Sequence, residues 1–156
     1  MDFTRTIYKI LLESLQKQGF LFQTFEQFLK QQERKSIVLR HDVDKLPSNS
    51  LAIAHIENTL SIKGSYYFRI SPCSFNENII KQIADLGHEI GYHYETMDTC
   101  NGNIDKAYDE FCRNVEKFRK IYPIKTICMH GSPRSKFDNK DLWKKYDYHD
   151  FGIIGE

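Results

Sequence analysis

Residues 36–44 read SIVLRHDVD, an apolar and partly β-branched run that leads into two aspartates separated by one residue. Such a run is typical of a buried strand, and we predict a strand over 37–43. Further strands are predicted at 65–70, 89–93, 125–129 and 151–154, separated by helical patterns over about 50–62, 74–86, 103–122 and 139–146. This alternation with short loops predicts an α/β fold with a parallel sheet or barrel.

The residues before this alternation have helical patterns. Apolar positions at helical spacing over 4–18 end at Gly19, and the stretch from Thr24 to Gln27 fits a capping box that opens a second helix. We therefore expect a helical lead over 1–34 and βα units over 36–156. The 156 residues suffice for one domain with a hydrophobic core, so a single domain over 1–156 is expected. Because the chain ends directly after a predicted strand, the sheet is expected to be incomplete at its C-terminal end.

The bulk composition argues against several classes of protein. Lys+Arg 22 against Asp+Glu 21 gives a net charge of +1, so no general attraction to nucleic acid is indicated. No run approaches the ~18 apolar residues of a membrane span. The four cysteines form no CxxC pair, which argues against a zinc ribbon or a thioredoxin motif. The start, MDFTRTIYKILLESL, has no signal-peptide cleavage pattern, and a reducing, cytoplasmic setting is expected.

Polar side chains gather where the predicted strands end, which is where active sites lie in folds of this kind. Alternation along a strand places Arg40, Asp42 and Asp44 on one face. Two carboxylates so close repel each other unless a positive charge intervenes, and either a metal ion or Arg40 supplies it. The competing interpretation is an ordinary solvated loop in which the aspartates cap the next helix.

Histidines supply the second part of the pattern. His93 and Glu95 share a face if the third strand continues, and His130 follows the fourth strand. Imidazole and carboxylate together suit a divalent cation such as zinc, or cobalt or nickel through the same ligands. By contrast, His88 is expected to be a structural, hydrogen-bonded residue at a turn, and His149 a surface residue.

Four segments in order resemble one known family. They are RHDVD (40–44), GHEIGYHYETMD (87–98), MHGSP (129–133) and DFGIIGE (150–156). Together they resemble the polysaccharide deacetylase superfamily, the NodB-homology carbohydrate esterases of family four. The resemblance implies a distorted (β/α) barrel, here short at its C-terminal end. It also implies a metal-dependent hydrolase that removes an acetyl group from an N- or O-acetylated sugar, with zinc as the expected metal.

The resemblance also implies roles for single residues. Asp42 matches the family's general base, Asp44 a metal ligand, and His93 the first of two ligand histidines. The second histidine would fall on Met97, whose thioether is a poor zinc ligand. The third ligand is therefore open between Glu95 and His130.

Two further catalytic roles are expected. His130 stands where the family has an arginine, and it is also the candidate that protonates the leaving amine. Arg40 is expected to hold Asp42 ionised.

Two other functions remain open. One is a catalytically inactive, deacetylase-like protein that binds or assembles polysaccharide, which Met97 favours. The other is a phosphatase of the haloacid-dehalogenase type, because Asp-Val-Asp after an apolar strand also fits that nucleophile loop. Lys45-Leu46-Pro47 and the unused GHEIGYH strand disfavour the phosphatase. The expected partner is a carbohydrate, and an incomplete barrel would leave a strand edge for self-association.

Overall fold

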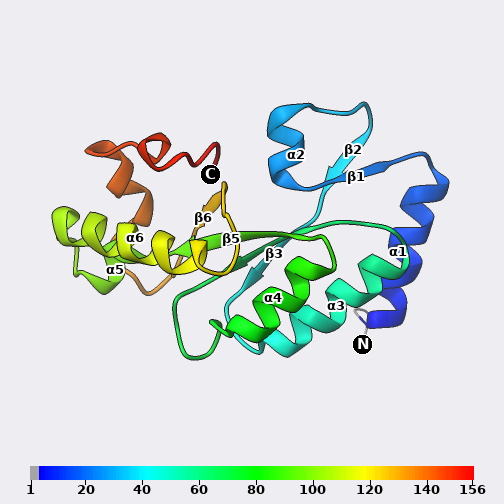
Figure 1. The fold of residues 1–156 in the computed structure, drawn as a ribbon, viewed down its shortest axis with the longest axis horizontal. Helices are drawn as coiled ribbons and strands as arrows, with labels where there is room; N and C mark the ends of the chain where they lie inside the picture. The colour runs from blue at the N-terminus through cyan, green and yellow to red at the C-terminus, as the bar shows by residue number, and fades with distance from the viewer. Residues whose placement is uncertain (1–3) are drawn as a thin grey trace.

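The computed structural model describes residues 4–156, in which strands and helices alternate along the chain (Figure 1). Both sheets are parallel: four strands follow one another in the order β3-β4-β5-β6, and β1 pairs with β2. The α/β class with parallel strands is therefore confirmed. The elements are α1 (Arg5–Lys17), β1 (Leu21–Gln23), α2 (Phe25–Lys30), β2 (Ser36–Val38), β3 (Arg40–Val43), α3 (Pro47–Thr59), β4 (Ser65–Phe68), α4 (Glu77–Asp85), β5 (Glu89–Tyr94), α5 (Thr96–Thr99), α6 (Ile104–Arg119), β6 (Ile127–Met129), and the 3-10 helices η1 (Asn139–Lys144) and η2 (Tyr148–Phe151).

The four-stranded sheet curls into a half-barrel, with α3, α4 and α6 on its outer side (Figure 1). Alternation along the strands gives this side an apolar surface. Its side chains and the facing helix residues form the main hydrophobic core, which includes Val43, Tyr66, Phe68, Ile80, Ile83, Ile90, Tyr92, Tyr94, Phe111, Val115 and Phe118. Because the four strands run parallel, the carboxyl ends of β3 to β6 meet at one rim.

The inner face of the sheet is polar, in contrast to the outer face. Glu89 is buried, and its carboxylate accepts hydrogen bonds from Ser65 Oγ (2.5 Å), Thr126 Oγ1 and the Glu26 backbone N–H (3.1 Å). A buried carboxylate is tolerated when donors surround it in this way. The bond to Glu26 also fastens the start of α2 to the inner face.

Gly91 is required on this inner face by a close approach. A Cβ there would lie 2.3 Å from the Tyr67 ring and 2.9 Å from the Thr126 carbonyl oxygen, well inside normal contact. The glycine of GHEIGYH thus makes room for Tyr67, whose hydroxyl contacts Thr126 Oγ1 at 3.0 Å.

The N-terminal part differs from the sequence prediction. The helical lead expected over 1–34 contains the strand β1, and its positions 1–3 lie outside the described residues. A three-residue strand is too short to give a clear alternation in the sequence. The strand predicted over 37–43 is divided at Leu39, so that its first part pairs with β1 and its second with β4.

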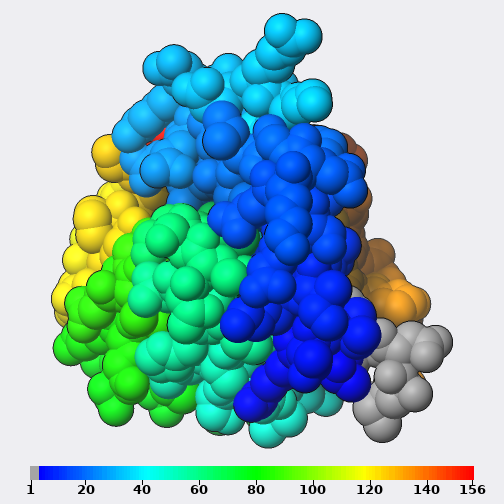
Figure 2. All heavy atoms as spheres, turned by 90° about the vertical axis from the view of Figure 1, so that its right-hand side faces the viewer, coloured from blue at the N-terminus to red at the C-terminus, as the bar shows by residue number. Residues whose placement is uncertain are grey.

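The first helix packs along α3 on the outside of the molecule. Figure 2 shows α1 beside the teal segment that contains α3, with the β1–β2 region above them. Tyr8, Leu12 and Ile62 form a second, smaller apolar cluster beneath α1. No helix within residues 4–156 is long and apolar enough to cross a membrane.

The prediction of a C-terminal strand over 151–154 was wrong. Residues 148–151 form η2, which Asp147 caps, and the chain turns at Gly152 with φ 65°. Only an isolated bridge from Gly155 to Thr126 extends the sheet there. Similarly, the helix predicted near 139–146 is the 3-10 helix η1.

The predicted helix starts had mixed outcomes. The capping box from Thr24 to Gln27 is confirmed, and the helix predicted from residue 103 begins there, with Asn103 as its N-cap. The helix predicted from residue 74 begins later, because Asn76 caps α4 (Glu77–Asp85). The Ser74 hydroxyl instead donates to the Val43 carbonyl and accepts from the Arg69 backbone N–H (3.1 Å).

Candidate metal centre

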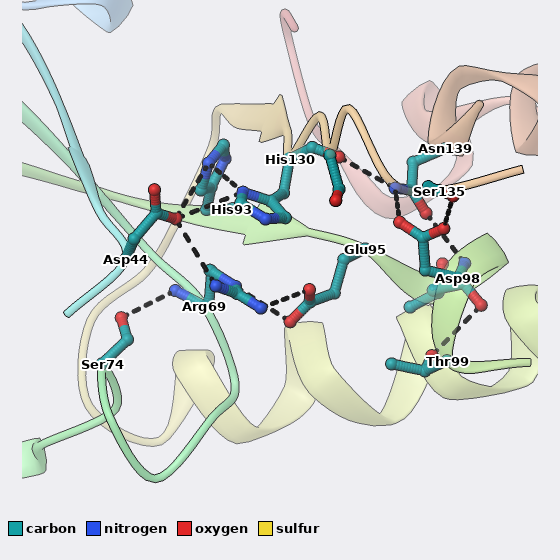
Figure 3. Close-up of polar contacts among 12 residues, drawn as sticks. Asp44, Arg69, Ser74, His93, Glu95, Asp98, Thr99, His130, Ser135 and Asn139 are labelled. Carbon is teal, nitrogen blue, oxygen red and sulfur yellow. Dashed lines mark hydrogen bonds and ion pairs between the residues drawn. The ribbon is translucent and has the colours of Figure 1, made fainter. Parts of the chain in front are cut away.

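Three side chains converge at the rim where β3, β5 and β6 end. Asp44 Oδ1 lies 3.2 Å from His130 Nδ1 and 3.8 Å from His93 Nε2, and the two imidazole nitrogens are 3.1 Å apart (Figure 3). Zinc ligands at about 2.0–2.2 Å from the ion in a tetrahedron are about 3.3–3.6 Å from one another. The three atoms are therefore spaced as the ligands of one ion would be.

His93 is held in the tautomer that a metal ligand needs. It is buried in the middle of the sheet, and its Nδ1 lies 3.0 Å from the carbonyl oxygen of Cys128 on β6. A carbonyl only accepts hydrogen bonds, so Nδ1 carries the proton and the lone pair of Nε2 points into the site. Burial lowers the pKa of His93, although the hydrogen bond to Cys128 acts in the opposite direction. The lowered pKa favours the neutral ring.

Asp44 supplies an oxygen whose hydrogen-bonding capacity is unused. Its side chain is 46% exposed, but Oδ1 itself is buried and accepts no hydrogen bond from any residue within 4–156. Buried polar atoms in native proteins are normally satisfied, and one that is not calls for an explanation. A cation between Asp44, His93 and His130 would satisfy Oδ1, so the donor set fits a divalent metal of the zinc type.

Asp42 lies beside this group and has a different neighbour. Arg40 Nη2 donates to Asp42 Oδ2 at 2.7 Å, so Arg40 is placed as the expected counter-charge. Burial acts to lower the pKa of Arg40, but the hydrogen bond to Asp42 and the electrostatic contributions of Asp42, Cys128 and Tyr67 together outweigh it, and the pKa is raised. An oxygen of Asp42 also lies within 4.8 Å of a His93 ring nitrogen and of Cys128 Sγ. Asp42 thus adjoins the three-residue group without belonging to it.

Glu95 is occupied elsewhere. Arg69 Nε and Nη2 donate to its two carboxylate oxygens at 3.0 and 2.6 Å, and Arg69 Nη1 lies 3.7 Å from Asp44 Oδ1 (Figure 3). Of the two candidates for the third ligand, the structure brings His130 to Asp44 and His93. Glu95 instead pairs with Arg69.

Some residues of the site had little signal in the sequence. The sequence placed Arg69 only near the end of the strand predicted over 65–70. No sequence pattern indicated that it would pair with Glu95. His88 and His149 lie where they were expected. His88 is buried and bonded to the Gly64 N–H and the Ala54 carbonyl, both at 3.0 Å, and the His149 side chain is 60% exposed on η2.

Comparisons of the chain with protein-family models, with curated proteins and with solved structures found no match. Functional inference therefore depends on the geometry of the site and on the sequence motifs.

Proposed function

We propose that the protein is a metal-dependent hydrolase of the polysaccharide deacetylase type, which removes an acetyl group from an acetylated sugar. The observation that carries the proposal is the buried, unsatisfied Oδ1 of Asp44 facing two imidazole nitrogens at 3.2 and 3.8 Å. Two histidines, one carboxylate and an open position are the donor set of many catalytic zinc sites. The half-barrel with its site at the carboxyl ends of the strands also agrees with a divergent NodB-homology fold.

Asp44, His93 and His130 would hold the ion, and the other residues have separate tasks. A bound divalent ion supplies Lewis acidity, since it polarises the carbonyl under attack and makes water a better nucleophile. Asp42 would accept the proton of the attacking water, and Arg40 holds its carboxylate in position through a hydrogen bond. Arg69 fixes Glu95 at the rim and adds positive charge near Asp44. The acyl carbon gains the hydroxyl, its bond to the sugar nitrogen or oxygen breaks, and the leaving atom takes up a proton from solvent.

One observation favours a second candidate, a non-catalytic protein that binds polysaccharide. The sequence offered His130 as the proton donor for the leaving group, but its Nδ1 faces Asp44 and His93 as a ligand would. An amine is a poor leaving group unless it is protonated, whereas an alcohol needs less assistance. Loss of the proton donor would therefore impair N-deacetylation more than O-deacetylation.

The test combines metal binding with acetate release. The purified chain is stripped of metal, titrated with Zn²⁺ and Co²⁺, and assayed with N-acetylated oligosaccharides and with O-acetylated sugars. We expect uptake of one ion per chain and metal-dependent release of acetate. Asp42→Asn should keep the ion and lose at least about 100-fold in rate, as removal of a general base does.

The outcomes separate the two candidates. Metal uptake with no acetate release from either substrate, together with retention on immobilised glycan, would establish the binding protein instead. Wild-type protein that takes up no ion would contradict the proposed metal site.

A further inference from the structure

Asn139, the first residue of η1, is buried and uses its whole side-chain amide. Its exposed fraction is 1%, and it lies between the loop after β6 and the short helix α5. Its Oδ1 accepts from the backbone N–H groups of Met97 (2.9 Å) and Asp98 (3.3 Å). Its Nδ2 donates to Asp98 Oδ2 (2.8 Å) and to the carbonyl oxygen of His130 (2.9 Å) (Figure 3). Two donors and two acceptor contacts are the full capacity of an amide.

The bond to His130 completes the fixation of that residue's main chain. The His130 backbone N–H donates to the Tyr94 carbonyl at 2.8 Å, which continues the sheet by one residue beyond β6. The carbonyl lies where the sheet has ended, and Asn139 holds it there. With both backbone groups held, the Cα–Cβ bond of His130 has one direction, and the ring reaches His93 and Asp44. His93 needs no such help, because it lies within β5.

The same amide also binds the position where the sequence resemblance places a second ligand histidine. Met97 occupies that position, and its backbone N–H is bonded to Asn139 Oδ1. Asn139 thus connects residue 97 to residue 130.

We propose that Asn139 is the positioning residue of the metal centre, which sets His130 in place as the third ligand. This inference rests on the proposed metal site and adds a residue that acts on the ion only through His130. Residues that orient ligands from outside typically contribute about 10–100-fold to metal affinity.

Only an amide satisfies these contacts. An aspartate at 139 would keep the bonds from Met97 and Asp98 N–H, but it would place a carboxylate against Asp98 Oδ2 and the His130 carbonyl. An alanine would leave that carbonyl and the Met97 N–H without partners, whereas the Asp98 N–H would keep its bond to the Glu95 carbonyl (3.0 Å). Both changes release His130 from its position.

The experiment measures Zn²⁺ affinity by competition with a chromophoric chelator, and the visible spectrum of Co²⁺-loaded protein, which reports the number and geometry of ligands. We expect Asn139→Ala and Asn139→Asp to weaken Zn²⁺ binding about 10–100-fold. Ser135→Ala is the matched control, because the Ser135 hydroxyl donates to the same Asp98 carboxylate without touching His130. Its affinity should stay within about threefold of wild type, as expected for a change outside the contacts of a ligand.

A double variant separates positioning from general stability. Asp98→Asn with Asn139→Asp restores an amide–carboxylate pair between the two side chains, but no donor faces the His130 carbonyl. We expect thermal stability to recover in part, because the clash with residue 98 is removed, and Zn²⁺ affinity and the Co²⁺ spectrum to remain impaired. If affinity recovers with stability, the role of Asn139 is structural and the proposal is overturned.

The remaining outcomes are also decisive. If Asn139→Ala binds Zn²⁺ as wild type does, the positioning role is wrong while the metal site stands. If wild-type protein binds no Zn²⁺, the proposed function and the positioning role fall together.

Discussion

Two groups of similar composition lie on opposite sides of β3, each with two histidines and one carboxylate. On the outer side, the carboxylate of Glu57 accepts from Tyr8 Oη (2.5 Å), His41 Nε2 (2.6 Å) and Tyr66 Oη (2.7 Å). His88 completes that group at 3.5 Å. On the inner rim, Asp44 lies between His93 and His130 at similar distances, but its Oδ1 accepts no hydrogen bond from residues 4–156.

The difference teaches which group is structural. Glu57 is fully buried, and burial alone would raise its pKa. Hydrogen bonds from His41, Tyr8 and Tyr66 outweigh burial and hold the pKa of Glu57 below its ordinary value. The group connects α1, β3, α3 and β4 and has no coordination left to offer. The rim group has ligand atoms of the same kind that point at a common centre, and one of them, Asp44 Oδ1, accepts no hydrogen bond from residues 4–156.

The largest expected effect is on stability, from Glu57→Gln. Glutamine has only one acceptor oxygen for the two tyrosine hydroxyls and the imidazole that bond Glu57. Its NH₂ group would face one of these donors. Breaking a buried, hydrogen-bonded ion pair typically costs about 3–5 kcal/mol, and we expect the free energy of unfolding to fall by about 3 kcal/mol. Urea denaturation measures it.

The control for this variant is Glu116→Gln, which removes an exposed carboxylate from α6 that, among residues 4–156, pairs only with Arg119 in an i,i+3 contact. Its effect should be below about 0.5 kcal/mol. Equal losses in the two variants would refute the structural assignment of Glu57.

The second prediction concerns Asp44→Asn, which should have the opposite profile. The free energy of unfolding of the metal-free protein should change by less than about 1 kcal/mol, because Oδ1 has no hydrogen bond from residues 4–156 to lose and its ion pairs are partly exposed. Zn²⁺ affinity should fall at least about 100-fold, since a ligand is worth more than the outer contacts that orient one. Urea denaturation and chelator competition provide both values. A large stability loss with unchanged affinity would reverse the comparison.

The smallest expected effect is a pH dependence through His88. Burial is the main cause that lowers the pKa of His88, against the opposing charge of Glu57. The folded protein therefore takes up a proton on His88 less readily than the unfolded chain does. The contribution of neutral His88 to the free energy of unfolding is fully present above the pKa of the unfolded chain, about 6.5. As pH falls below that value, the free energy of unfolding decreases by at most about 1.4 kcal/mol per pH unit.

Urea denaturation of the metal-free protein between about pH 7.5 and pH 5.5 tests this sign. His88→Gln should lower stability at both ends and make the profile flatter, while His149→Gln, on the exposed η2, should leave the slope unchanged. A slope that persists in His88→Gln would assign the pH dependence to another group, such as His93, whose pKa burial also lowers.

Local patterns predicted much of the fold. Helical spacing and caps identified α1, α2 and α6, and apolar runs identified β3 to β6, because those signals lie within a few neighbouring residues. The same patterns failed for β1 and for residues 151–154. In β1 three residues carry too little alternation, and at 151–154 a capped 3-10 turn replaces a strand of suitable composition.

The sequence by itself determined the α/β alternation, the pairing of Arg40 with Asp42, and the position of Asp44 and His93 at strand ends. Each follows from alternation or from short spacing along one strand. Only the tertiary structure brings His130, and not Glu95, to Asp44 and His93, because Glu95 pairs with Arg69, which follows β4. The tertiary structure alone revealed the role of Asn139. Its side chain bonds to Met97, 42 positions earlier in the chain, and to His130, 9 positions earlier. Such contacts are set by how the strands and loops pack, and no spacing rule along the chain encodes them.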